Sequence, residues 1–197
     1  MSPAQAGHMA TETAGERLLP RGKVGIWWFL ASEIITFGGL IGAYLIYFWG
    51  SDHIQEPATH LSLAVGSINT LILLTSSLTM VLSHAASGKD DDRAAARWLS
   101  WTVLLGLAFL VIKGFEWTTE IGAGFTPAAG IFWSFYYIMT GLHGLHVLGG
   151  VVVNALLLRW VLTGGVKSVG GRIEYGGLYW HFVDLVWIFL FPLLYLT

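Results

Sequence analysis

The stretch Thr140-Gly141-Leu142-His143-Gly144-Leu145-His146-Val147 places two histidines inside an apolar segment that is long enough to cross a membrane. A second run, Trp180-His181-Phe182-Val183-Asp184, places a histidine and an aspartate in the same setting. Such side chains are costly in hydrocarbon, and they normally face other helices or a water-filled cavity. The two runs therefore predict an all-α polytopic membrane protein whose polar residues meet inside a helix bundle.

The composition of the 197 residues supports residence in a membrane. Hydrophobic residues make up 55% and charged residues 11%, whereas a soluble domain carries about 25% charged residues. The net charge of −2 gives no basic surface for nucleic acid. Because there is no cysteine, disulfides, thiolate metal sites and a thiol nucleophile are excluded, and histidine is the main possible metal ligand.

Five apolar segments are predicted to span the membrane as helices. They cover residues 24–48, 61–84, 98–117, 131–160 and 178–196, so that 24–197 forms one transmembrane domain. Residues 1–23 are small and polar and lack the apolar region of a signal peptide, which predicts a mobile cytoplasmic tail.

The distribution of lysine and arginine predicts the orientation of the spans. Nine of these residues lie in the N-terminal tail and in or beside the loops after the second and fourth spans, and Lys113 alone lies toward the opposite side. Cytoplasmic loops carry the excess of positive charge. We therefore expect a cytoplasmic N-terminus and a periplasmic C-terminus.

Glu33 is the one charged residue within the first span. It follows Lys23 by ten residues, roughly 15 Å along a helix, which places it near the middle of the membrane. It can pair with a neighbouring helix, be protonated, or bind and relay protons, and the sequence leaves these three open. Gly38 and Gly42 form a small-residue face where another helix can approach closely.

The histidines have a spacing that is compatible with metal ligands on one helix face. His143 and His146 are three residues apart on one helix face, as are His181 and Asp184. The repeated Glu-x-x-His pattern of di-metal bundles is absent. We therefore favour buried, hydrogen-bonded histidines over a metal site, and we expect Asp184 to act as a polar clamp between helices.

Other polar residues mark the second and third spans. Asn69 and Thr70 can bond to carbonyls of their own helix or across to another helix. Glu116 and Glu120 lie at the outer end of the third span, where we expect solvated or capping groups and no acid–base role.

In this order, the residues resemble subunit III of the haem-copper cytochrome c oxidases. The resemblance covers 24–197, and five spans are typical of many bacterial members, whereas the longest members have seven. The matching stretches are Trp28-Phe29-Leu30-Ala31-Ser32-Glu33-Ile34, Ile68-Asn69-Thr70, Lys113-Gly114-Phe115-Glu116-Trp117, Thr140 to Val147, and Tyr179 to Trp187.

The resemblance implies an accessory subunit of a respiratory oxidase that passes electrons from cytochrome c to oxygen and pumps protons. It implies no catalytic residue and no redox centre in this chain, with haem and copper held by partner subunits. Its partners would be the catalytic subunit I, subunit II, phospholipid and possible members of a respiratory supercomplex, in the bacterial inner membrane. Its role would be to stabilise subunit I, bind lipid and support proton uptake.

Residue by residue, the resemblance makes Glu33 the membrane carboxylate linked to protons or lipid. It makes Arg159 and His181 contacts of a lipid head group. The residues that it assigns to buried polar packing are Asn69, Thr70, Glu116, His143, His146, Trp180 and Asp184.

Two alternatives stay open. The chain could be the third subunit of a quinol oxidase or the related accessory subunit of nitric oxide reductase, since the electron donor is decided on another subunit. A stand-alone proton channel is the alternative of a different class, with a relay through Glu33, the membrane histidines and Asp184. Neither an internal repeat nor the paired broken helices of transporters supports it.

Overall fold

A computed structural model of the chain describes residues 21–48, 61–169 and 171–196. The helices in this part are α2 (Arg21–Phe48), α4 (Leu63–Ser87), α5 (Asp92–Gly122), α6 (Ile131–Val169) and α7 (Arg172–Tyr195). All five are long and apolar enough to cross a membrane, which confirms the predicted all-α, five-span architecture. The predicted N-terminal tail lies outside the described residues except for its last three positions, which belong to α2.

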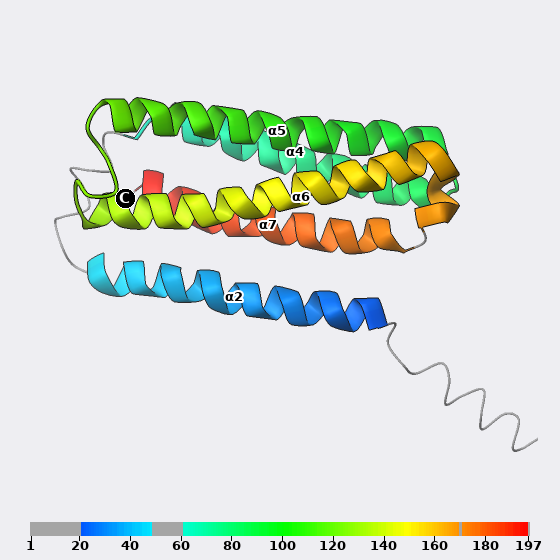
Figure 1. Cartoon of the computed structure of the whole chain (residues 1–197), viewed down its shortest axis with the longest axis horizontal. Coiled ribbons are helices and arrows are strands. Elements are labelled where there is room, and N and C mark those ends of the chain that lie inside the picture. The colour runs from blue at the N-terminus through cyan, green and yellow to red at the C-terminus, as the bar shows by residue number, and fades with distance from the viewer. Residues whose placement is uncertain (1–20, 49–60, 170, 197) are drawn as a thin grey trace, which may run out of the picture.

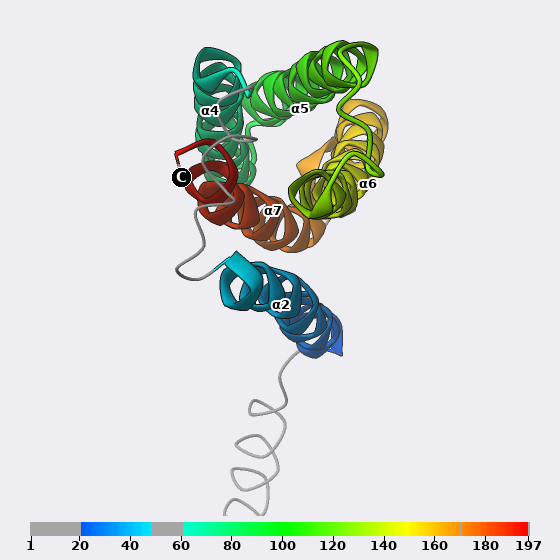
Figure 2. The same ribbon diagram turned by 90° about the vertical axis from the view of Figure 1, so that its left-hand side faces the viewer.

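Four of the helices form a ring in which α4 packs against α5, α5 against α6, α6 against α7, and α7 against α4 (Figure 2). Helix α2 lies outside this ring, against α7 and α6 (Figures 1 and 2). The start of α2, the α4–α5 turn and the α6–α7 turn share one end of the molecule, on the right in Figure 1. We call it the basic end, after Lys23, Lys89, Arg93, Lys167 and Arg172.

The helices continue beyond the apolar segments into the charged stretches at the basic end. Polar caps set their limits: the side chain of Asp91 accepts a hydrogen bond from the backbone N–H of Ala94 and starts α5. In α6, Gly165 leaves the helical conformation with φ of 72°, and Asp92 accepts a hydrogen bond from the N–H of Val166 at 2.8 Å. The loops are therefore shorter than hydropathy alone indicates.

The interior of the ring is built around Trp180 of α7, which is fully buried. A Cβ atom at Gly106 of α5 would lie 2.7 Å from its ring, and one at Gly150 of α6 would lie 2.6 Å from it. The indole N–H donates to Ser76 Oγ of α4 at 3.0 Å. Glycines on two helices and a serine on a third thus let four helices close around one large side chain.

Helix α2 buries one narrow stripe. Leu30, Phe37 and Tyr44 recur every seven residues and are all buried, which is the spacing of a single packing seam. A Cβ atom at Gly38 or Gly42 would meet nothing within 4 Å in the structure. The predicted small-residue face is therefore present, but none of the described helices packs into it.

Candidate functional site

The Glu33 carboxyl of α2 meets the His146 imidazole of α6, with 3.0 Å between Oε2 and Nε2. Both side chains are mostly enclosed, at 17% and 16% exposure. The rings of Phe37 and His146 pack in a T-shaped arrangement, and the Tyr179 hydroxyl donates to the backbone carbonyl of His146 at 2.9 Å. Of the three possibilities left open by the sequence, the geometry favours pairing with a neighbouring helix.

The Glu33–His146 contact requires a shared proton, whether the two side chains are both neutral or form an ion pair. His146 Nδ1 lies 2.8 Å from the carbonyl oxygen of Leu142, which can only accept, so Nδ1 carries a hydrogen. The contact between Nε2 and Glu33 Oε2 then needs one further proton, either on the carboxyl or on the ring. The pair has no net charge in both cases, which suits its depth in the membrane.

A second polar cluster lies in the half of the bundle away from the basic end, where the ammonium group of Lys113 is enclosed. Its Nζ donates to Glu116 Oε1 at 3.1 Å, to the Tyr136 hydroxyl at 3.1 Å and to the Tyr195 hydroxyl at 2.5 Å. Both tyrosines donate to the same Glu116 oxygen. We call these four residues the outer cluster. It ties α5, α6 and the end of α7 together through a fully bonded ammonium group.

The expectation that Glu116 and Glu120 are solvated is wrong, because they are only 7% and 8% exposed. They face the interior of the ring, since helix α5 runs on to Gly122 and keeps them within the packed bundle. The partners of Glu116 were missed. Lys113 lies three residues earlier on the same helix face, which is a signal that the sequence does contain.

His143 differs from the expectation of a hydrogen-bonded histidine. It is 1% exposed, yet neither ring nitrogen has a hydrogen-bond partner among the described residues. Its ring instead stacks on Trp187 at a centroid distance of 5.2 Å and meets the face or edge of Phe109 at 5.6 Å. His143 therefore packs as an aromatic side chain, and of the two histidines in this stretch it is His146 that links two helices by a side-chain hydrogen bond.

The remaining predicted packing residues fall into two groups. Trp180 and Thr70 make hydrogen bonds between helices, the second by accepting from the indole N–H of Trp187 at 3.0 Å. Asn69 and Asp184 are buried, but their side-chain oxygens have no hydrogen-bond partner in the described part of the chain. Asp184 therefore makes no side-chain hydrogen bond there that would form the expected polar clamp between helices. His181 lies 2.6 Å from the Ser77 hydroxyl.

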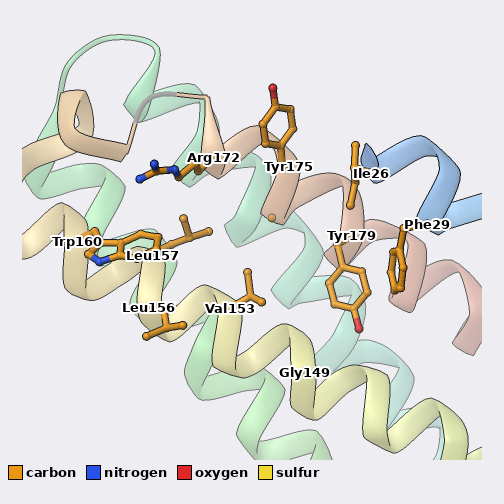
Figure 3. A pocket seen from close by; sticks show the side chains of 11 residues that line it. Ile26, Phe29, Gly149, Val153, Leu156, Leu157, Trp160, Arg172, Tyr175 and Tyr179 are labelled. Atoms are coloured by element: carbon orange, nitrogen blue, oxygen red, sulfur yellow. The ribbon is translucent and has the colours of Figure 1, made fainter. Parts of the chain in front are cut away.

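An elongated apolar cavity of ≈ 490 Å³ lies where α2, α6 and α7 meet (Figure 3). Val153 and Leu156 of α6 line one side, and Ile26 and Phe29 of α2 close one end. The other end, toward the α6–α7 turn, holds Arg172, whose guanidinium lies 5.3 Å from the centre of the Trp160 ring. An apolar channel with a cation at one end suits an acyl chain with an anionic head group.

The two predicted head-group residues lie elsewhere. Arg159 is exposed and does not line this cavity, whereas the cation that does is Arg172. His181 lines a smaller cavity between α4 and α7. Among residues 21–48, 61–169 and 171–196, no group of three or more histidine, aspartate or glutamate side chains could hold a metal ion.

The fold and these sites define an all-helical, polytopic membrane protein in which polar pairs join the helices. A family model for cytochrome c oxidase subunit III matches residues 17–197. The cytochrome c oxidase subunit 3 of Alkalihalophilus pseudofirmus is 37% identical over 92% of this chain and 90% of its own length. The probable quinol oxidase subunit 3 of Staphylococcus haemolyticus is 36% identical over 88% of each chain.

A third relative is a fused protein. The haem-copper oxidase subunit I+III of Aeropyrum pernix is 33% identical over 90% of this chain, which corresponds to 23% of the relative's length. The chain belongs to the cytochrome c oxidase subunit III family and is a subunit III of the haem-copper oxidases.

Proposed function

We propose that the chain is a non-catalytic subunit III that stabilises the catalytic subunit of a bacterial respiratory oxidase. The observation that carries this proposal is the family match, which extends over all five spans. The reaction itself, with its haem and copper, would take place on partner subunits.

Its partners would be oxidase subunits I and II in the bacterial inner membrane. The fused relative supports contact with subunit I, because a covalent fusion keeps the two parts together. The concentration of lysine and arginine at the basic end supports a cytoplasmic position for this end and a periplasmic C-terminus. Membership in a respiratory supercomplex is a further possibility for the assembled enzyme.

Phospholipid would occupy the cavity between α2, α6 and α7. The cavity runs along the helices and ends at Arg172 and Trp160, a cation and an aromatic ring of the kind found at membrane interfaces. In this proposal Arg172 takes the head-group role that the sequence suggested for Arg159, and His181 belongs to a different site.

Glu33 would be linked to proton uptake through His146. A pair that shares a proton inside the membrane can respond to changes in local proton supply while it keeps α2 against the bundle. This role would be supportive, since membership of the subunit III family supports haem and copper on partner subunits.

The electron donor has two candidates. Relatives named for cytochrome c oxidase and for quinol oxidase match this chain at almost the same identity, 37% and 36%. Cytochrome c is our first choice of electron donor, and a quinol is the second.

The testing experiment is to tag this chain, extract it in mild detergent, and record the absorption spectrum and the co-purifying proteins. Haem bands together with a large multi-span partner are expected. The reductant that reduces the haem, cytochrome c or a quinol, would name the donor. A colourless protein that comes without partners and conducts protons in vesicles would support the channel alternative instead.

A further inference from the structure

A group of titratable side chains lies between α4 and α7, separate from Glu33 and from the outer cluster. His84, Glu174 and His181 line a cavity of ≈ 160 Å³ toward the basic end. His84 is exposed, and the other two are partly exposed. The cavity therefore connects with the surface of the bundle.

On each of the two helices, polar residues two turns apart form a row that runs from the surface to the interior. Glu174 and His181 are seven residues apart on α7, and Ser77 and His84 are seven apart on the antiparallel α4. The inner pair is in contact, since Ser77 Oγ lies 2.6 Å from His181 Nδ1. A hydroxyl can accept one proton while it donates its own, so this contact can pass a proton inward.

Asp184 lies one helical turn beyond His181 and is 4% exposed. The Ser77 hydroxyl, which meets His181 at 2.6 Å, lies close to the Asp184 carboxyl group, and neither carboxyl oxygen has a hydrogen-bond partner within the described chain. An ionised carboxylate at this place would lack the donors that it needs. A protonated carboxyl requires only one acceptor, and the serine hydroxyl is beside it.

We propose that Asp184 is a proton-binding site in the bundle interior, and that it exchanges its proton with the basic end through Ser77, His181 and the cavity beyond them. In the loading direction, a proton from solvent in the cavity binds Nε2 of His181. The Nδ1 proton moves to the Ser77 hydroxyl, and the hydroxyl's own proton moves to the Asp184 carboxylate. The ring returns to neutral with its proton on Nε2, so the charge gained by Asp184 equals the charge taken from solvent.

Other buried titratable groups have interactions of their own and do not supply this path. In the outer cluster, Lys113 and Glu116 of α5 bond to two tyrosines, and Glu120 lies nearby. His143 of α6 packs between aromatic rings, and Glu33 of α2 pairs with His146. The proposal does not depend on the electron donor, on bound lipid or on the Glu33 pair.

The test uses the purified oxidase complex and infrared spectroscopy of protonated carboxyl groups. The band that disappears in Asp184→Asn is assigned to Asp184, and Asp184→Glu, which keeps a carboxyl group but shifts its band, confirms the assignment if the asparagine variant assembles poorly. The measured quantity is the rate at which this band shifts when water is replaced by heavy water. Ser77→Ala and His181→Phe are expected to slow the shift by about tenfold or more.

Thr75→Ala is the matched control on the same helix, because its hydroxyl donates to the carbonyl of Leu71 at 2.7 Å and not into the cavity. It should leave the exchange rate unchanged. Two results would overturn the proposal: the absence of any protonated Asp184 band over the pH range in which the complex is stable, or an exchange rate in Ser77→Ala and His181→Phe equal to that of the unmodified chain.

Discussion

Glu33 of the first described helix and His146 of α6 are separated by 113 positions in sequence and by 3.0 Å between Oε2 and Nε2. Together with the Lys23–Glu174 ion pair at 2.9 Å and the bond from the Tyr44 hydroxyl to the Leu193 carbonyl at 3.3 Å, this contact links α2 to the ring at three depths. The attachment of α2 therefore depends on a few polar contacts beside its apolar stripe.

Replacing Glu33 by alanine should leave oxygen reduction possible but shorten the time over which the enzyme sustains it. The variant loses the contact to His146, and α2 is held less firmly over the apolar cavity between α2, α6 and α7. Oxygen consumption should be recorded as an initial rate and as its decay during turnover. Glu33→Gln is the control, since its amide can donate to Nε2. An enzyme that is inactive from the first turnover would require a direct catalytic role for Glu33.

His146→Leu should weaken the complex more than His143→Leu does. The first change leaves the Glu33 carboxyl without its partner, which costs about 1–3 kcal/mol. The second replaces a ring that makes no hydrogen bond in the described chain by an apolar side chain of similar size, which costs less than about 1.5 kcal/mol. Thermal unfolding of the purified complex measures both. Neither change should reduce metal content, and a metal lost with His143 would contradict our interpretation.

Lys113→Met should be strongly destabilising, because it leaves Glu116 and two tyrosine hydroxyls buried around a missing cation. Breaking a buried pair by removing one partner costs about 3–5 kcal/mol. The double variant Lys113→Met with Glu116→Gln removes both charges and should recover part of this loss. The midpoint of thermal unfolding is the measurement. Equal destabilisation by the single and the double variant would mean that the ion pair is not the source of the effect.

Gly150→Ala should impair folding of the subunit, because the added Cβ would lie 2.6 Å from the Trp180 ring. Overpacking of this kind costs about 1–3 kcal/mol. Gly38→Ala is the matched comparison, since its Cβ would meet nothing within 4 Å among the described residues. The yield of folded subunit should fall only for Gly150→Ala. If Gly38→Ala folds but loses subunit I, the small-residue face of α2 would be identified as a docking surface.

Arg172→Gln should lower the amount of phospholipid that stays with the purified complex, because it removes the cation at the end of the apolar cavity. Arg159→Gln, an exposed arginine outside the cavity, is the control and should leave the lipid content unchanged. Mass spectrometry of extracted lipid provides the measurement. The reverse result, with loss only in Arg159→Gln, would restore the head-group assignment that the sequence suggested.

The architecture was predictable because hydropathy and helix length are properties of contiguous sequence. The five segments and their order follow from the apolar runs, and the structure contains a helix at each of them. The positions of the helix ends were harder to predict, since hydropathy registers neither the side-chain cap of Asp91 nor the non-helical backbone of Gly165.

The polar residues were predictable in identity but not in pairing. The depth of Glu33 and the position of His146 both indicate inward-facing groups, yet only the packing of α2 against α6 brings them together. The outer cluster was harder, because Tyr136 and Tyr195 look like ordinary interfacial aromatic residues in the sequence. His143 shows the opposite case, where a polar residue type is used for its aromatic ring.

Helix α2 packs against α7 and α6 rather than against α4, its successor among the described helices. Helix α2, the first of the described helices to be synthesised, can therefore complete its packing only after α7, the last of them, has been made. During synthesis Glu33 has no His146 and Lys23 has no Glu174, so an unfinished chain carries an unpaired acidic group at mid-membrane depth. A chain shortened before α6, which carries His146, would keep Glu33 unpaired, and this unpaired carboxyl would mark the chain as incomplete for the membrane's proteolytic quality control.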